Sequence, residues 1–344
     1  MRTRKSDRDL TPEQRRRELI DLLGSAAARM PNAVAIPHDP PRKKPSKSGQ
    51  TRLDVSAEMP LSVSTSKETD RPARCDCHAP ACAQVDPAGR TARIFRGMDE
   101  TIQALIDLHR GLARQGPGDA RVSRQILAEL PTMPAKPRIV DLGCGAGAGA
   151  MLLAEYFDAP VTAVDLAQPF LDDMMQRAGA RGLADRVHPL ACDFADLPLA
   201  PGSVDLLWSE GAAYNLTFAG ALEKWRPLLA PRGVAGISEL SWFTDDIPDE
   251  PRRYWEAAYP AMADEATNIA HAHAAGFDVL GTRRLPAQAW WDHYYNPLLE
   301  RMAALSDPDA TMQAVIAEVQ AEIDLFRQYR ACYGYTFYVL TSGA

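Results

Sequence analysis

The stretch V-D-L-G-C-G-A-G-A-G-A-M, residues 140–151, decides how this chain can be interpreted. An apolar strand end and one acid, Asp141, are followed by glycine at every second position from Gly143 to Gly149. Glycine has no Cβ, so the backbone can adopt positive φ there and a ligand can approach the main chain closely. The stretch predicts a tight turn between a strand and a helix, with a ligand beside it.

Two classes of ligand use such a turn after the first strand of a sheet. A dinucleotide places its pyrophosphate on the following helix N-terminus behind G-x-G-x-x-G or G-x-G-x-x-A, and Gly143, Gly145 and Ala148 satisfy the looser form. S-adenosylmethionine instead carries a sulfonium, an amino acid group and a nucleoside, without any phosphate. A purely structural turn would use the same glycines, so the glycines alone do not decide between these readings.

Composition narrows the class of protein. The 344 residues carry a net charge of −7, which argues against a general nucleic-acid or membrane-surface binder. No apolar run is long enough for a transmembrane helix, and the charged N-terminus lacks the apolar region of a secretory signal. Six cysteines are too few to resemble a disulfide framework. We therefore expect a cytoplasmic protein that binds neither nucleic acid nor membrane.

Residues 1–93 are expected to form an N-terminal extension. A capped helix is predicted over residues 11–30, and the Pro- and Ser-rich text that follows is predicted to be mostly disordered, because it cannot bury enough apolar surface. Within it, Cys75, Cys77, His78 and Cys82 are residue types that can bind zinc, but a second half of such a motif is missing, so a cysteine-bearing linker is the alternative.

Residues 94–344 alternate between helical and strand patterns. We expect two helices within 94–136, a ligand-binding core over 137–285 with six strands, an insert over 286–330 containing two helices, and a seventh strand within 331–344. Between the fifth and sixth strands one helix is predicted, over about 251–274. Strands separated by helical runs imply right-handed βαβ units and a parallel sheet with helices on both faces. The predicted fold class is α/β and Rossmann-like.

Three acids follow three successive strands of this predicted sheet. They are Asp141, Asp165 and Asp193. Because ligands of open α/β sheets bind at the carboxyl ends of the strands, the three should border one crevice. Asp165 suits a ribose diol in either ligand, and Asp193 suits an adenine amine. Asp141 discriminates, because a carboxylate beside the first glycine would repel a pyrophosphate and attract an ammonium or a sulfonium.

These motifs together resemble the class I S-adenosylmethionine-dependent methyltransferases. The texts are V-D-L-G-C-G-A-G, A-V-D, A-C-D-F-A-D-L-P and V-D-L-L-W-S-E-G, and the similarity covers roughly residues 95–344. It is closest to small-molecule methylases often labelled type 11 or ubiquinone-biosynthesis-like. The R-Q-G-P-G text upstream resembles one bacterial subgroup. The resemblance implies the strand order 3-2-1-4-5-7-6 with the last strand antiparallel.

The resemblance also implies roles for individual residues toward S-adenosylmethionine. Asp141 would lie near its amine, Asp165 would hold the ribose hydroxyls, and Ser209 would lie under the sulfonium. The other implied cofactor-binding residues are Gly143, Gly145, Gly147, Leu166, Asp193, Phe194, Arg114 and Gln115.

The acceptor is predicted to be a small, partly apolar or aromatic molecule. Transfer from a sulfonium needs alignment above all, and a base only if the nucleophile must lose a proton. Glu210 and Tyr214 are the predicted catalytic residues, with His109 and His293 as weaker candidates, and no metal is expected in the site. Aromatic residues of the 286–330 insert and of the last strand would form a pocket under a lid, although a core cluster is an alternative for the strand.

Two other functions remain compatible with the sequence. One is an NAD(P)-dependent oxidoreductase of the Rossmann class, which Asp141 disfavours. The other is a non-catalytic protein that binds S-adenosylmethionine. The sequence also leaves the oligomeric state open and allows a homodimer.

Overall fold

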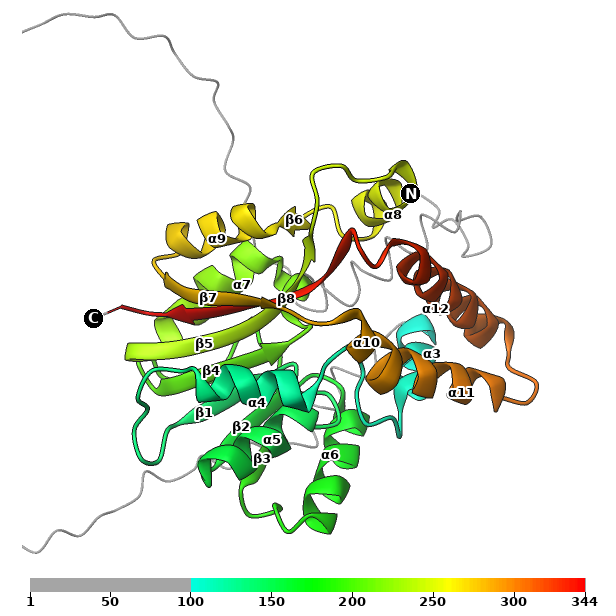
Figure 1. Cartoon of the computed structure of the whole chain (residues 1–344). Coiled ribbons are helices and arrows are strands. Elements are labelled where there is room, and N and C mark those ends of the chain that lie inside the picture. The colour runs from blue at the N-terminus through cyan, green and yellow to red at the C-terminus, as the bar shows by residue number, and fades with distance from the viewer. Residues whose placement is uncertain (1–99, 344) are drawn as a thin grey trace, which may run out of the picture. The chain divides into compact units, whose positions relative to one another are not determined.

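A computed structural model of the chain describes residues 100–343, and the predictions for residues 1–93, including the cysteine motif, lie outside the described residues. The described residues build one mixed sheet with strands in the order β3-β2-β1-β4-β5-β8-β7 (Figure 1). The strands are β1 (Ile139–Leu142), β2 (Val161–Asp165), β3 (Val187–Ala191), β4 (Val204–Glu210), β5 (Leu229–Trp242), β7 (Asp278–Arg284) and β8 (Tyr333–Thr341).

This order confirms the predicted topology. The two-residue strand β6 (Ala263–Asp264) pairs with the end of β5 and moves the later labels up by one, so the predicted order 3-2-1-4-5-7-6 is the same path. Strand β8 runs antiparallel to both β5 and β7, and the other neighbouring strands are parallel. The carboxyl ends of β1, β2 and β4 therefore meet at one edge of the sheet, as parallel strands must.

Helices cover both faces of the sheet. On one face, α4 (Ala120–Ala128), α5 (Ala148–Phe157) and α6 (Gln168–Ala180) share a buried apolar cluster with β5 and β8; on the other face, α7 (Phe218–Trp225) and α9 (Glu265–Ala274) do the same. The alternation of β5 explains this division, because Val234 faces the first cluster while Ala235 and Ile237 face the second. Short 3₁₀ helices η2 (Ala213–Leu216) and η3 (Arg226–Leu228) flank α7.

One predicted helix is wrong. The helix expected over about 251–274 is two helices, α8 (Asp249–Ala258) and α9, with β6 between them. Pro260 lies two residues after the end of α8 and disfavours a continued helix, and the Asp264 side chain accepts a hydrogen bond from Thr267 N at the start of α9. The proline and the N-cap thus divide a segment that the apolar spacing alone predicts to be one helix.

The remaining helices gather beyond the carboxyl edge of the sheet. They are α3 (Glu100–His109), α10 (Ala287–Trp290), the π-turn η4 (Trp291–Tyr295), α11 (Asn296–Ala303) and α12 (Ala310–Tyr329). The last four belong to the predicted insert, and α12 and α11 both contact α3 (Figure 1). In this helical layer, α3 from the start of the described residues packs against α11 and α12 from near their end. None of the helices within residues 100–343 is both long and apolar enough to cross a membrane.

Candidate active site

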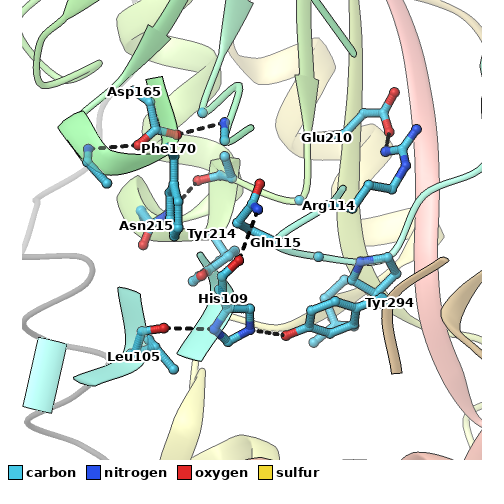
Figure 2. Close-up of a pocket in the computed structure, with 18 of the residues that line it drawn as sticks. Leu105, His109, Arg114, Gln115, Asp165, Phe170, Glu210, Tyr214, Asn215 and Tyr294 are labelled. Carbon is cyan, nitrogen blue, oxygen red and sulfur yellow. Dashed lines mark hydrogen bonds and ion pairs between the residues drawn. The ribbon is translucent and has the colours of Figure 1, made fainter. Parts of the chain in front are cut away.

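A cavity of about 430 Å³ lies between the strand tips and the helical layer, and Figure 2 shows part of its wall. The sheet contributes Asp141, Asp165 and Glu210, which stand at the carboxyl ends of β1, β2 and β4. The opposite side carries aromatic side chains, which come from η2, α8, α10, η4 and β8. The cavity therefore has two walls of different chemistry, here called the sheet wall and the aromatic wall.

The glycine turn forms the base of the sheet wall. Gly145 has φ of +51°, and a Cβ added there would lie 2.4 Å from Gln115 Oε1, so only glycine fits without displacement. That same amide oxygen accepts a hydrogen bond from Ala146 N at 2.6 Å. Gln115, predicted to bind the cofactor, thus lines the cavity and also holds the turn in place.

Asp165 supports the turn from the second strand. Its two carboxylate oxygens accept hydrogen bonds of 2.8 Å from the amides of Gly145 and Ala167 (Figure 2). Burial raises the pKa of Asp165, and these amides oppose the rise. A carboxylate oxygen can accept more than one hydrogen bond, so this pre-oriented group could also receive two hydroxyl donors. Leu166, Asp193 and Phe194 line the cavity beside it.

Asp141 lies against the first turn of α5. Its Oδ2 is 2.9 Å from where a Cβ on Gly149 would stand, and this oxygen has no hydrogen-bond partner within residues 100–343. Burial raises the pKa of Asp141 well above its usual range, the charge of Glu210 adds to this, and Arg114 opposes it. The carboxyl group thus lies where a phosphate would meet a helix N-terminus, and an ammonium would suit it better.

Glu210 is held in a network of donors. Its Oε2 pairs with the Arg114 guanidinium at 2.7 Å, and its Oε1 accepts from Ser123 Oγ at 3.0 Å and from Trp208 Nε1 at 2.9 Å. Both charged side chains are largely buried, with 12% and 9% of Arg114 and Glu210 exposed. A carboxylate with three donors is poorly placed to take a proton from an acceptor. The structure therefore favours a supporting role for the Arg114–Glu210 pair.

His109 forms a buried pair with Tyr294 at the boundary of the two walls (Figure 2). His109 Nδ1 lies 2.9 Å from Leu105 O, and a carbonyl can only accept, so Nδ1 carries the proton. Burial lowers the pKa of His109, which keeps the ring neutral, and Nε2 is then an acceptor. The Tyr294 hydroxyl lies 3.1 Å away and donates to it.

The aromatic wall is built from segments distant in sequence. Trp290 of α10 stacks on Tyr335 of β8 with ring centroids 5.1 Å apart, and Tyr214 of η2 meets Tyr259 edge-on at 6.1 Å. The other aromatic residues of this wall are Tyr254, Trp255 and Tyr294. Burial raises the pKa of Tyr214 to about 12, so its hydroxyl remains protonated. Strand β8 thus contributes to a pocket as well as to the core.

Some of the expected site residues do not line the cavity. The Ser209 hydroxyl is fully buried and donates to Leu142 O at 2.9 Å, so it joins β4 to β1 and does not reach a ligand in this structure. Gly147 caps α5 with φ of +81°, where a Cβ would meet Met174 at 2.2 Å. His293 is also absent from the wall. Ser209 and Gly147 thus have structural roles here, and their contacts with the cofactor stay predictions.

Glu239 was missed by sequence reasoning. It lies in the middle of β5, only 1% exposed, and neither carboxyl oxygen has a hydrogen bond of ordinary geometry within residues 100–343. Burial raises the pKa of Glu239 to about 8, and the nearby Tyr259 hydroxyl opposes the rise. Its position in S-E-L-S-W, an apolar strand text, is the signal that could have marked it, because a lone acid there must be buried.

Comparison with known proteins identifies the domain. Residues 139–233 match the family model described as a methyltransferase domain. The chain is 28% identical to the O-methyltransferase cnsE of Penicillium expansum over 53% of this chain and 71% of that protein. It is 43% identical to a malonyl-[acyl-carrier protein] O-methyltransferase of Laribacter hongkongensis over 39% of this chain, which spans less than half (45%) of that relative.

A solved structure shares the fold. The S-adenosylmethionine-dependent methyltransferase of Geobacter sulfurreducens, in complex with S-adenosyl-L-homocysteine, superposes with a TM-score of 0.60 at 21% identity, over 71% of this chain and 98% of that one. Together with the sequence matches, this shared fold shows that residues 139–233 form a methyltransferase domain and that the described chain has the fold of the class I S-adenosylmethionine-dependent methyltransferases. The matched segment runs from β1 into β5 and contains the glycine turn and all three strand-end acids. The dinucleotide oxidoreductase reading finds no support in these matches.

Proposed function

We propose that the protein transfers the methyl group of S-adenosylmethionine to a small, partly apolar or aromatic molecule. One observation carries this proposal: the sheet wall and the aromatic wall line the same cavity. A cofactor held on the first wall would present its methyl group toward a molecule enclosed by the second. Small-molecule sites are usually such largely apolar cavities with a few polar groups that fix orientation.

The sheet wall supports specific roles toward the cofactor. Asp141, with a buried oxygen that lacks a described partner, would pair with the α-ammonium. Asp165 would accept from the ribose hydroxyls while it holds the Gly145 amide. Leu166, Asp193 and Phe194 would surround the adenine, and Gln115 and Gly143 would border the methionine part.

The chemistry required of the protein is mainly alignment. The sulfonium supplies an activated methyl group and a neutral leaving group, so the acceptor atom must be held about 3 Å from the methyl carbon, in line with the bond that breaks. Tyr214 lines the cavity and keeps its proton, which suits it to orient the acceptor by a hydrogen bond. The role of Glu210 becomes the positioning of Arg114 rather than proton transfer.

The Tyr294–His109 pair is the best-placed route for a proton. The Tyr294 oxygen has lone pairs that can accept a proton from the acceptor while its own proton moves to His109 Nε2. The Leu105 carbonyl then keeps the ring oriented through Nδ1. An acceptor atom without a proton would not need this route.

Calorimetry of the full chain tests the proposed function first. S-adenosylmethionine and S-adenosyl-L-homocysteine are expected to bind at one site per chain, and NAD and NADP are expected to give no heat. A screen of small metabolites with S-adenosylmethionine carrying a labelled methyl group then identifies acceptors. Heat with a dinucleotide alone would reverse the assignment of the cofactor, and cofactor binding without any methylated product would favour the non-catalytic alternative.

A further inference from the structure

The cavity wall is strongly acidic. Its described lining contains six carboxyl groups and a single guanidinium, that of Arg114, which is paired with Glu210 at 2.7 Å. The carboxyl groups belong to Asp141, Asp165, Asp193, Glu210, Glu318 and Glu322. His109 adds no charge because burial lowers its pKa. An anionic ligand would therefore meet a wall of its own sign, while a cationic ligand would be attracted.

Two of the six carboxyl groups come from helix α12, on the side of the aromatic wall. Glu318 and Glu322 are four residues apart and lie on one face of the helix, and both line the cavity. The Tyr295 hydroxyl donates to Glu322 Oε1 at 2.8 Å and orients it. The charge of Glu322 raises the pKa of three tyrosines that line the cavity, Tyr214, Tyr294 and Tyr335, which indicates how close it lies to the rings.

Aromatic rings line the same cavity as these carboxylates. Trp290 stacks between Tyr335 and Phe326, at centroid distances of 5.1 and 4.1 Å, so the indole is held rigidly beside the cavity. Tyr294 is held by its bond to His109. Ring faces attract an organic cation through their quadrupole, and more strongly when the site excludes water. Carboxylates and fixed rings on one wall are therefore the chemistry that recognises a small organic ammonium.

We propose that the methyl acceptor is a small amine, which enters the cavity as its ammonium ion and is recognised by Glu318, Glu322 and the surrounding rings. The inference rests on the proposed function and names its substrate class. A carboxylate or phosphate acceptor would bring another negative charge to a wall whose described guanidinium is already paired. An alcohol can donate a hydrogen bond to a carboxylate but brings no positive charge to pair with it, so it gains less than an ammonium.

The reaction then balances with the groups that line the cavity. The ammonium first loses one proton to the Tyr294 oxygen as the Tyr294 proton moves to His109 Nε2, which leaves a neutral amine and an imidazolium. The nitrogen lone pair attacks the methyl carbon, and the C–N bond forms while the C–S bond breaks. The electron pair of the C–S bond stays on sulfur, which becomes a neutral thioether. The product is the methylated ammonium, and the imidazolium returns its proton to water.

Three probes of similar shape test the inference on the full chain saturated with S-adenosyl-L-homocysteine. They are phenethylamine, 2-phenylethanol and 3-phenylpropionate, titrated calorimetrically at neutral pH. We expect phenethylamine to bind at least about tenfold more tightly than the alcohol, and the carboxylate to bind most weakly. Equal affinities, a preference for the carboxylate, or no amine binding up to millimolar concentration would overturn the inference.

Substitutions in α12 test whether its two carboxylates cause the preference for the amine. Glu318→Gln and Glu322→Gln should each weaken phenethylamine binding by about five- to tenfold while the alcohol changes by less than about twofold. Asp324→Asn is the matched control, because Asp324 lies on the same helix but is 55% exposed and pairs with Arg327. Binding of S-adenosyl-L-homocysteine separates the two proposals. If the wild type did not bind S-adenosyl-L-homocysteine, the proposed function would be contradicted. If it bound the cofactor but showed no preference for the amine, only the proposal of an amine acceptor would be contradicted.

Discussion

Carboxyl groups at the sheet wall and near the aromatic wall differ in their hydrogen bonds. On the sheet wall, Asp165 accepts two backbone amide hydrogen bonds, and these amides come from the glycine turn and the start of α6. Glu239, which interacts with Tyr259 of the aromatic wall, does not itself line the cavity and has no hydrogen bond of ordinary geometry within the described residues. The first wall is organised by backbone groups close in sequence, and the second by large side chains from distant segments.

This difference suggests that the sheet wall determines cofactor binding and the aromatic wall determines which methyl acceptor fits. On the sheet wall, the binding surface is formed by backbone amides and small residues. Such a surface depends little on individual side chains, which suits a cofactor that many enzymes share. Packed rings and a few carboxylates depend on individual side chains, which fits a particular acceptor. The two walls should therefore respond differently to substitution: changes in the aromatic wall should alter stability and acceptor choice, and changes in the sheet wall should alter cofactor affinity.

The largest expected effect is on stability. Trp290→Ala removes the ring that packs against Phe326 and Tyr335, and should lower the free energy of unfolding by about 3–5 kcal/mol. Urea unfolding measures this loss. Trp290→Phe is the control that keeps a stacked ring and should lose less. If the folded Trp290→Ala protein also lost most of its affinity for S-adenosyl-L-homocysteine, the division between the walls would fail.

Glu239→Gln should stabilise the protein at alkaline pH. The folded chain keeps a proton on Glu239 up to about pH 8, whereas the unfolded chain loses it near the ordinary glutamate pKa of about 4.3, so wild-type stability falls as pH rises through this window. The variant lacks this loss and should be more stable than the wild type by about 5 kcal/mol at high pH, and nearly equal to it in acid.

Thermal unfolding over a series of pH values measures the effect of Glu239→Gln. The control is Glu223→Gln, on the exposed side of α7, which should follow the wild type. A constant difference between Glu239→Gln and the wild type at every pH would contradict the account of a buried, protonated carboxyl group.

Asp165→Ala should weaken binding of S-adenosyl-L-homocysteine about a hundredfold, because it removes both the ribose acceptor and the support of the Gly145 amide. Calorimetry gives the affinity. Asp172→Ala, an exposed acid on α6 that accepts only from Gln168 among its described hydrogen bonds, should bind like the wild type. An unchanged affinity in Asp165→Ala would remove this residue from the cofactor site.

Gln115→Ala should have the smallest effect. It leaves the Ala146 amide without its acceptor and should cost about 1 kcal/mol, seen as a roughly fivefold weaker affinity for S-adenosyl-L-homocysteine. Gln103→Ala, on an exposed part of α3, is the control. A stability loss without any change in cofactor affinity would limit Gln115 to a structural role.

The sheet wall could be predicted from the sequence because its signals are local. Gly143, Gly145 and the acids at strand ends lie within short texts, and parallel strands bring their carboxyl ends to one edge without further information. The hydrogen bond of the Ser209 hydroxyl could not be predicted in this way, because strand alternation does not say which neighbour the hydroxyl meets. In the structure that neighbour is Leu142 O.

For the aromatic wall, the sequence predicted which residue types would be present but not which of them would be in contact. The pair of His109 and Tyr294 spans 185 residues, and no local pattern joins them. Glu210 appeared catalytic at its strand end, until the fold brought Arg114, Ser123 and Trp208 to it as donors. Such pairings depend on how the helical layer packs over the sheet, which short-range spacing does not determine.

A crystal structure of the full chain with S-adenosyl-L-homocysteine tests the central claim most directly. The homocysteine amino group is expected beside Asp141, the ribose hydroxyls on Asp165 and the sulfur facing the rings of Tyr214 and Tyr294. The same ligand with its adenosine inserted among the rings of Trp290 and Tyr335, or bound outside this cavity, would contradict the assignment of the two walls.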